Sequence, residues 1–362
     1  MRFDHSPFLV IWETTQACDL ACAHCRASAL PRRHPQELTS DEGFQLLEEI
    51  RGFGDPLMIF TGGDPLKRPD IYELLSYSVS LGLRTTITPS ATPLLTREAV
   101  HRIASSGVAR MAISIDDAAA AEHDSFRGVL GSFDRSISAL GWASEEGLQT
   151  QVNTTVTRHN HHRLEDIAAL VAEAGVTLWS VFFLVATGRA SPEDDLTAQE
   201  YEDVFAYLYR LSKTAPFDIK TTEAQHYRRF VAEQRKIEGA RRSAGGRGDL
   251  IARHGGINDG KGLVFVSHTG EIYPSGFLPI AAGNVRTQSL TDVYRNHPLF
   301  LTLRDPSGFS GKCGVCEFRN LCGGSRSRAF ALEGDHLASD PRCVYQPAAF
   351  ASAALASQEA HG

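Results

Sequence analysis

Short apolar runs alternate along the first 215 residues with segments whose apolar positions recur at helical spacing. The runs are five to eight residues long and rich in β-branched and aromatic residues, as buried strands are. Strands that alternate with helices indicate a parallel sheet covered by helices. The six predicted strands are Phe8–Thr14, Leu57–Thr61, Leu83–Thr88, Arg110–Ile115, Gln149–Val156 and Leu178–Val185.

The segments between these strands carry helix-start signals. Thr39 with Glu42, and Thr197 with Glu200, form capping boxes ahead of apolar residues at helical spacing. Because right-handed crossovers curl such a sheet, the expected fold is α/β, a partial (β/α)6 barrel. By analogy with the complete eight-stranded barrel, chemistry-bearing residues are expected where the strands run into the following loops.

The composition changes after the last predicted strand, and a hairpin of Leu263–Ser267 and Glu271–Tyr273 is predicted beyond the change. A segment rich in Arg and Gly precedes this hairpin and is expected to be a flexible loop. The expected parts are a barrel at 1–215, a bridging segment with the flexible loop at 216–262, a small cysteine-rich C-terminal domain at 263–348 and a disordered tail at 349–362.

Composition and charge exclude several classes of protein. The chain has 362 residues, of which 42% are hydrophobic and 22% charged, as in ordinary soluble domains. A formal net charge of −7 does not favour a nucleic-acid partner. No apolar stretch approaches the ~20 residues of a membrane span, so no membrane partner is expected. Because no secretory signal is recognised, a cytoplasmic location with reduced thiols is expected.

Seven cysteines fall into two groups at opposite ends of the chain. An odd number of reduced thiols, gathered in this way, indicates two metal sites rather than disulfides. The triplet comprises Cys18, Cys22 and Cys25, and the quartet comprises Cys313, Cys316, Cys322 and Cys343.

The triplet has the spacing C-x3-C-x2-C. Three thiolates can surround an iron–sulfur cubane and leave one iron without a cysteine, and an open coordination position is what a catalytic site needs. A zinc site made of the three cysteines and His24 is the alternative that the spacing leaves open.

The triplet, with a ring at His24, resembles the C-x3-C-x-Φ-C motif of radical S-adenosylmethionine (SAM) enzymes. The resemblance implies that the triplet binds a 4Fe–4S cluster and that the methionine group of SAM chelates the fourth iron. One electron from the cluster would cleave SAM, and the 5′-deoxyadenosyl radical would take a hydrogen atom from the substrate. An electron donor such as flavodoxin or ferredoxin is implied as a partner.

Further positions fit the same family. The Gly62–Pro65 segment, G-G-D-P, resembles the family's G-G-E-P segment, whose backbone binds the methionine amine. Ser114 and Asn153 belong to the fourth and fifth predicted strands, at positions where relatives contact the methionine carboxylate or the ribose. No catalytic acid or base is assigned. The implied SAM contacts are Gly62, Gly63, Asp64, Ser114 and Asn153.

The quartet, C-x2-C-x5-C-x20-C, supplies enough thiolates to close a metal site completely. Its spacing alone leaves a structural zinc knuckle and an iron–sulfur cluster open. Beside the triplet it resembles the SPASM or twitch extension of radical SAM enzymes, which carries auxiliary 4Fe–4S clusters. Ser275 and Ser325 stand where full SPASM domains have further cysteines. Two clusters in all are therefore expected, the quartet's serving electron transfer.

The region from Cys322 to Cys343 and the Thr187–Arg189 segment resemble enzymes of alternative heme and heme d1 biosynthesis and mycofactocin-type peptide maturases. The resemblance implies an oxidoreductase for a carboxylate-bearing, tetrapyrrole-like small molecule or, alternatively, for a ribosomally made peptide. Residues 228–253 hold eight basic and three acidic side chains, a surplus that suits a carboxylate substrate or a solvated loop equally. A zinc-stabilised binding protein without catalysis is the alternative from another class.

Overall fold

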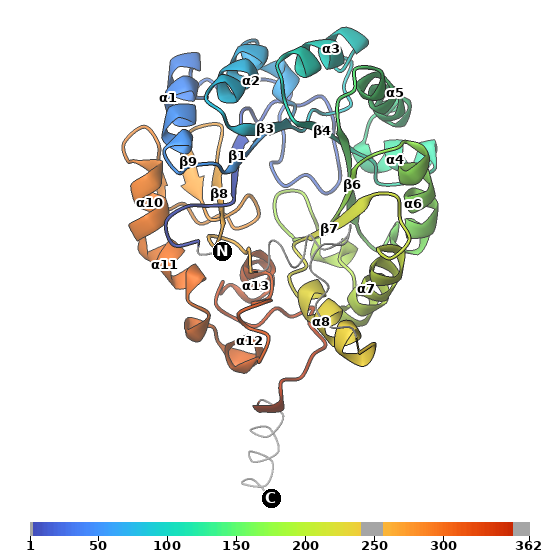
Figure 1. The fold of residues 1–362 in the computed structure, drawn as a ribbon, viewed down its shortest axis with the longest axis vertical. Coiled ribbons are helices and arrows are strands. Elements are labelled where there is room, and N and C mark those ends of the chain that lie inside the picture. Colours follow the sequence, from blue (N-terminus) through green and yellow to red (C-terminus); the bar gives the residue numbers. More distant parts are fainter. Residues whose placement is uncertain (1–2, 240–255, 350–362) are drawn as a thin grey trace, which may run out of the picture.

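One ten-stranded sheet curves around the centre of the molecule (Figure 1). The computed structural model describes residues 3–239 and 256–349. Strands β1 to β7 follow one another across the sheet, each parallel to the next. The strands are β1 (Leu9–Glu13), β2 (Leu57–Thr61), β3 (Arg84–Ile87), β4 (Arg110–Ser114), β5 (Thr150–Val156), β6 (Leu178–Phe183), β7 (Asp218–Thr222), β8 (Leu263–Val266), β9 (Glu271–Tyr273) and β10 (Gly283–Asn284).

Helices cover the outside of this curved sheet and form the outer ring in Figure 1. Those that follow the parallel strands are α1 (Ser40–Arg51), α2 (Ile71–Ser80), α3 (Arg97–Ser105), α4 (Ala120–Arg127), α5 (Ser132–Glu145), α6 (Leu164–Glu173), α7 (Ala198–Leu211) and α8 (Tyr227–Ile237). The C-terminal ones are α10 (Leu290–Asn296), α11 (Pro298–Arg304), α12 (Gly311–Val315) and α13 (Arg326–Glu333). Single 3-10 turns lie at η1 (Pro65–Lys67), η2 (His161–Arg163), η3 (Pro192–Asp194) and η4 (Pro306–Gly308).

Side chains alternate between the two faces of each strand. In β1, Val10 and Trp12 are fully buried, and the Trp12 ring packs against Gly43 of α1. Leu9 and Ile11, which point the other way, line a cavity inside the barrel. The period-2 pattern thus separates the helix-facing core from the face that surrounds the cavity.

The predicted elements of the barrel are confirmed. All six predicted strands are present, with ends that differ by at most two residues. Both capping boxes form, since Glu42 and Glu200 exchange hydrogen bonds with Thr39 and Thr197 at the starts of α1 and α7. The predicted hairpin is β8 and β9, which pair antiparallel.

The count of six parallel strands is too low. β7 pairs in parallel with β6 inside the segment that was predicted to be a bridge, 216–262. Its sequence, D-I-K-T-T, has a single apolar side chain, Ile219, so it lacks the apolar run that reveals a buried strand. β8 also joins the same sheet, parallel to β1. The boundaries at 215, 262 and 348 stay a prediction.

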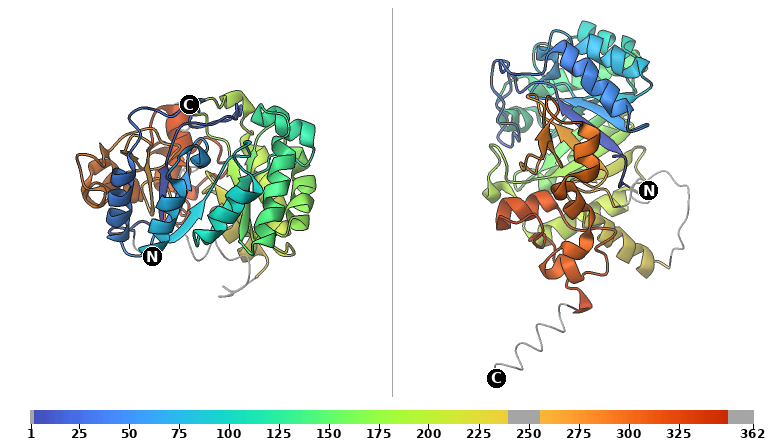
Figure 2. Two further views of the ribbon diagram at one scale, coloured as in Figure 1. Left: turned by 90° about the horizontal axis from the view of Figure 1, so that it is seen from above. Right: turned by 90° about the vertical axis from the view of Figure 1, so that its left-hand side faces the viewer.

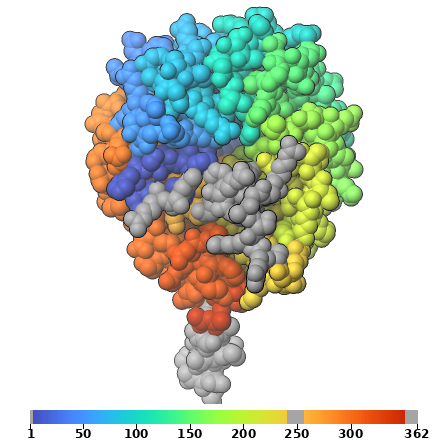
Figure 3. Space-filling model, in the orientation of Figure 1, coloured from blue at the N-terminus to red at the C-terminus, as the bar shows by residue number. Residues whose placement is uncertain are grey.

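The C-terminal region joins the two ends of the barrel sheet. It contacts the N-terminal segment, where the Tyr294 hydroxyl donates to the Phe3 carbonyl at 2.7 Å, and it contacts α8, where Arg228 donates to the Leu321 carbonyl at 3.4 Å. In Figure 3 these orange and red residues adjoin both the blue segment and yellow α8, and the right-hand view of Figure 2 shows the same from another side. Within the described residues, no helix is long and apolar enough to cross a membrane. The predicted tail lies outside the described residues from 350 on.

Candidate active site

The loop that carries the triplet leaves the C-terminal end of β1 and is held by the loop after β2. The Gly63 N–H donates to the Thr15 carbonyl at 2.7 Å, and the Asp64 N–H donates to the Ala17 carbonyl at 2.6 Å. A Cβ atom at Gly63 would lie 2.5 Å from the Ala17 oxygen. Gly63 is therefore required by the close packing of these two loops.

Two further elements fix the same loop from the other side. The Ala21 and Ala23 N–H groups donate to carbonyls at the end of α4, at 3.1 and 3.0 Å. After β6, Arg189 donates its backbone N–H to the Cys25 carbonyl and its Nε to the Cys22 carbonyl, both at 3.0 Å. Three elements from different parts of the chain thus set the relative positions of the triplet sulfurs.

Each triplet sulfur has an N–H donor. The Leu20 N–H lies 3.4 Å from Cys18 Sγ, the Ala29 N–H lies 3.5 Å from Cys25 Sγ, and Arg127 Nη1 lies 3.7 Å from Cys22 Sγ. Burial raises the pKa of Cys18 to about 11 and also raises the pKa of Cys22. Buried thiolates at these positions therefore need a cation, and a metal site supplies one.

Arg127, at the end of α4, is the charged side chain that donates to Cys22 Sγ. Its Nε donates to Asp116 Oδ2 at 2.6 Å, and the Thr155 N–H donates to the other oxygen of Asp116 at 2.8 Å. Burial raises the pKa of Asp116, but Arg127 and the neighbouring histidines outweigh it and hold that pKa below its usual value. This buried pair connects Cys22 with β5.

His24 is fixed by stacking. Its ring lies parallel to the Phe126 ring, with centroids 4.3 Å apart and 9° between the planes. Burial lowers the pKa of His24 to about 4, so the ring is neutral at pH 7. Its Nδ1 atom is buried without a hydrogen-bond partner among the described residues.

A cavity of about 340 Å3 opens in front of the triplet. The structure brings most of the predicted SAM contacts to it, since Gly62, Gly63, Ser114 and Asn153 line the cavity together with the three cysteines. The cysteines and glycines lie in the loops after β1 and β2, Ser114 ends β4, and Asn153 lies in the middle of β5. Most of these residues lie at the edge where parallel strands place functional groups. Their roles toward SAM stay a prediction.

Asp64 lies behind this lining. Its buried carboxylate accepts the Thr92 hydroxyl at 2.6 Å and the N–H groups of Leu66 and Ser90 at 3.1 and 3.3 Å. Ser90 in turn donates its hydroxyl to the Gly63 carbonyl at 2.7 Å. Burial raises the pKa of Asp64, against the effect of these hydrogen bonds. The carboxylate thus supports the glycine backbone from the side away from the cavity.

Two polar cavity residues on the later strands, Gln151 and Lys220, were not identified from the sequence. Ser114, Asn153, Ser180 and Lys220 are partners in register on the adjacent strands β4 to β7, so they form one row across the sheet. Lys220 lines the cavity, as does Gln151, which donates to Asn153 Oδ1 at 2.7 Å. The alternation of polar positions along β5 could have revealed Gln151. Lys220 gave no signal because β7 was not recognised as a strand.

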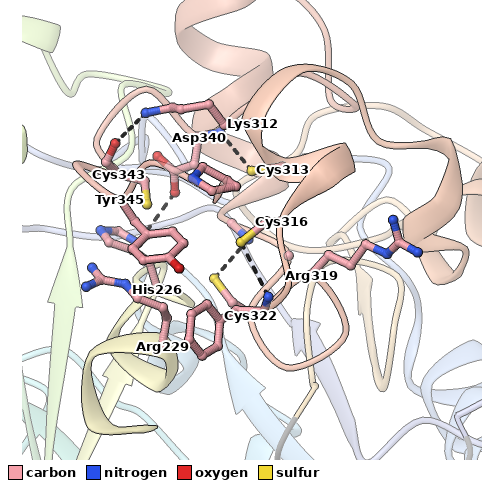
Figure 4. Close-up of a pocket in the computed structure, with 14 residues that line it drawn as sticks. His226, Arg229, Lys312, Cys313, Cys316, Arg319, Cys322, Asp340, Cys343 and Tyr345 are labelled. Atoms are coloured by element: carbon pink, nitrogen blue, oxygen red, sulfur yellow. Dashed lines mark hydrogen bonds and ion pairs between the residues drawn. The ribbon is translucent and has the colours of Figure 1, made fainter. Parts of the chain in front are cut away.

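The quartet lines a second, small cavity in the C-terminal region (Figure 4). Backbone N–H groups again point at the sulfurs. Asp340 donates to Cys313 Sγ at 3.5 Å, Phe318 to Cys316 Sγ at 3.4 Å, and Gly324 to Cys322 Sγ at 3.3 Å.

Positive side chains surround the quartet. Lys312 donates to the Cys343 carbonyl at 2.7 Å, and Arg229, Arg319 and Lys312 all line the cavity. Burial raises the pKa of Cys343 to about 12, and burial raises the pKa of Cys322 as well. As at the triplet, these half-buried thiolates need positive charge at close range.

A buried polar chain joins the rim of the large cavity to the quartet. The Ser325 hydroxyl donates to Glu223 at 2.6 Å, and Arg328 Nη2 donates to the Glu223 carbonyl at 2.6 Å. Arg328 also contacts Asp340, 3.3 Å away, whose N–H points at Cys313. Burial, with the negative charge of Asp259 beside it, raises the pKa of Glu223 to about 8. Glu223 is mostly protonated at pH 7.

The Arg-rich segment is only partly described, because 240–255 lie outside the described residues. Of its first residues, Arg229 pairs with Glu202 and with Glu233, and Arg228 bonds the Leu321 carbonyl. These two side chains attach α8 to its surroundings. They do not line the large cavity.

The donor sets fit iron–sulfur clusters. All seven cysteines, which lie in the described residues, are free thiols. Thiolates are the ligands of such clusters, and N–H···S hydrogen bonds are among the interactions that tune them. In residues 3–239 and 256–349, no group of three or more His, Cys, Asp or Glu side chains is arranged around a single metal ion.

The fold and the site define an α/β barrel enzyme in which a three-thiolate loop faces a large cavity at the C-terminal ends of the strands. The model of the Radical SAM superfamily matches residues 12–171, which run from β1 into α6. Together with the relatives described next, this match shows that the chain belongs to the radical SAM superfamily. It is therefore an S-adenosylmethionine-dependent enzyme, and the alternative of a non-catalytic zinc protein is wrong.

The chain is similar over nearly its whole length to two proteins called AdoMet-dependent heme synthase, AdoMet being SAM. It is 42% identical to that of Nitratidesulfovibrio vulgaris, over 94% of this chain and 92% of the relative. It is 38% identical to that of Methanosarcina barkeri, over 95% and 98%. A pre-heme d1 synthase and a mycofactocin maturase match at 27% and 29% identity, which confirms the predicted branches.

Among solved structures, Streptococcus suis SuiB bound to S-adenosylmethionine superposes with a TM-score of 0.73 at 17% identity. The match covers 94% of this chain and 78% of SuiB. At this identity the likeness shows the fold, and it confirms the barrel expected from the sequence.

Proposed function

We propose that the protein catalyses a SAM-dependent radical step that forms heme from a tetrapyrrole bearing additional carboxylate side chains. The observation that carries this proposal is the 42% and 38% identity to AdoMet-dependent heme synthases over nearly the full length of each chain. A large cavity in front of the triplet gives such a substrate a place beside the cofactor.

The triplet is proposed to hold a 4Fe–4S cluster, and the cavity wall beside it to hold SAM. When bound, this cluster supplies the electron that cleaves SAM and so generates the radical that takes hydrogen from the substrate. Gly62 and Gly63 offer backbone groups at the cavity wall, and Ser114 and Asn153 offer side-chain hydrogen bonds. Asp64 acts through Ser90, which fixes the Gly63 carbonyl.

The quartet is proposed to hold the second 4Fe–4S cluster and to serve electron transfer. Four cysteines leave no position for SAM, so its role differs from that of the triplet. The chain of Glu223, Arg328 and Asp340 gives a buried connection between the substrate cavity and this site. After the hydrogen atom is removed, release of the adjacent side-chain carboxylate as CO2 would leave one electron to be carried away, and this electron would pass to the quartet side. Flavodoxin or ferredoxin would reduce the triplet cluster in the cytoplasm, where thiols stay reduced.

A second candidate function is the modification of a ribosomally made peptide. The mycofactocin maturase of Mycobacterium ulcerans is 29% identical to this chain over 95% of it. The identity to the heme synthases is higher, so a tetrapyrrole is the substrate class that we put first.

The test is anaerobic turnover of the reconstituted enzyme with SAM and reduced flavodoxin. Iron tetrapyrroles with more carboxylates than heme are supplied as substrates, and 5′-deoxyadenosine and heme are measured by chromatography and by the pyridine hemochrome spectrum. Formation of both products supports the proposal. Cleavage of SAM without any change in these tetrapyrroles, but with modification of a co-encoded peptide, would replace it by the second candidate.

A further inference from the structure

Lys220 is a cation on the inner face of β7. It lines the large cavity and lies in the row with Ser114, Asn153 and Ser180. Adjacent strands are about 4.8 Å apart, so its Cα lies roughly 10 Å from that of Asn153 along the curved sheet. Lys220 is thus at the opposite end of the row from the predicted SAM contacts.

Its charge is not compensated, in contrast to the other long cationic side chains of the cavity. Arg26 pairs with Glu13 at 2.6 Å, and Arg127 pairs with Asp116 at 2.6 Å. Among the described residues, Lys220 makes no hydrogen bond or ion pair. Lys220 is therefore the one lysine or arginine of the described cavity lining without an acidic partner.

The surroundings of Lys220 disfavour its unpaired positive charge. Burial, together with the positive charges of Arg228 and Arg110, lowers the pKa of Lys220 to about 8. Glu223 is the acid that opposes them, but its carboxylate bonds Ser325 and is mostly protonated at pH 7. Lys220 is half-buried, and a partly desolvated cation without a counterion is stabilised when an anion joins it. Because Lys220 lines the cavity, a molecule bound there can supply this anion.

We propose that Lys220 binds a carboxylate side chain of the substrate and so determines which part of it faces the triplet. The assignment rests on the proposed function, since a tetrapyrrole with acidic side chains supplies such a group. It makes Lys220 a substrate-binding residue that sets specificity. An ammonium with no acid of its own favours a carboxylate over an uncharged group, because the ion pair forms in a partly desolvated cavity.

The experiment compares two ligands that differ in charge. Heme, with its free propionates, and heme dimethyl ester are titrated into the reconstituted enzyme, and binding is followed by the Soret band. Lys220→Met keeps the length of the side chain and removes its charge, and Lys220→Arg keeps the charge. Lys236→Met, an exposed lysine of the last turn of α8, is the matched control.

Lys220→Met is expected to weaken heme binding about 10- to 100-fold, the effect of one hydrogen bond between charged groups. It should weaken ester binding far less, and Lys220→Arg should restore most of the affinity for heme. The cycle of variant and ester isolates the interaction between Lys220 and the propionate.

Equal losses for heme and ester, or no loss for either, would overturn the role of Lys220 and leave the proposed function standing. A matching loss of SAM affinity would show that the anion is that of SAM, and would also overturn the assignment. A wild-type enzyme that binds neither heme nor the ester would overturn both proposals together.

Discussion

Gly188, in the loop after β6, provides the sharpest test of how the triplet is held. Its φ is +64°, and a Cβ atom there would lie 2.3 Å from both the Cys25 and the Arg26 carbonyl oxygens. Contacts below 3.0 Å are essentially absent for real Cβ atoms, so Gly188→Ala must move one of the two loops by about 0.7 Å or more. One of these loops carries the backbone of a triplet cysteine, Cys25. We therefore expect the variant to misplace Cys25 and to lose the triplet cluster.

Gly175→Ala is the matched control. Gly175 also has a φ of +64°, but nothing lies within 4 Å of its Cβ position. Both variants incur the same left-handed strain of about 1 kcal/mol. Gly188→Ala should be less stable than the control by a further 1–3 kcal/mol, roughly the cost of overpacking.

The assays are urea unfolding of the apoprotein and iron analysis after anaerobic reconstitution. Two cubanes contain about eight irons, so Gly188→Ala should retain about four while Gly175→Ala retains all of them. If Gly188→Ala matched the control in both stability and iron, the loop after β6 would not position the triplet and the reasoning would be refuted.

Three further predictions concern the chemistry of the site. Replacing all triplet cysteines by Ala should abolish 5′-deoxyadenosine formation. Replacing Cys316 and Cys322 by Ala, in a protein that still folds, should leave SAM cleavage but stop substrate turnover. If this quartet variant still formed product, the electron-transfer role of the quartet would be disproved. Asp64→Ala should weaken SAM affinity, measured by equilibrium dialysis, with a normal iron content, because the Gly63 backbone loses its support through Ser90; unchanged affinity would reduce the segment to a structural turn. Because the pKa of Glu223 is raised to about 8 by burial, the folded state binds its proton more tightly than the unfolded state. Stability should therefore fall as the pH rises from 5 to 8, by at most about 1.4 kcal/mol per unit, and Glu223→Gln should flatten this dependence in urea titrations; equal slopes would contradict it.

Much of the barrel could be predicted from the sequence because its strands bury apolar runs on the helix-facing side. β2 has four apolar residues in succession, and five of the six residues of β6 are apolar. The capping boxes at Thr39 and Thr197 mark the starts of α1 and α7. The triplet and the quartet could be found for a different reason. Cysteine spacing is a local property that does not depend on how distant segments pack.

The remaining parts of the site depend on contacts between distant segments. Arg127 reaches Cys22 across 105 positions in the sequence, and no local pattern marks it as a neighbour. β7 could not be predicted because its cavity-facing residues, Lys220 and Thr222, are polar and break the apolar pattern of a buried strand. The orientation of Asp64 likewise follows from Ser90 and Thr92, which lie on the next loop.

The pairing of β8 with β1 has a consequence for biosynthesis. Leu9 pairs with Leu263, so the two strands are separated by about 250 residues of chain. At a translation rate of about 5–20 residues per second, β8 is synthesised roughly 12–50 s after β1. During that time the open edge of β1 can pair with other chains, as unprotected strand edges do. Chaperone binding to the nascent barrel, or prompt burial of that edge, would then decide how much of the protein reaches the state that can accept its clusters.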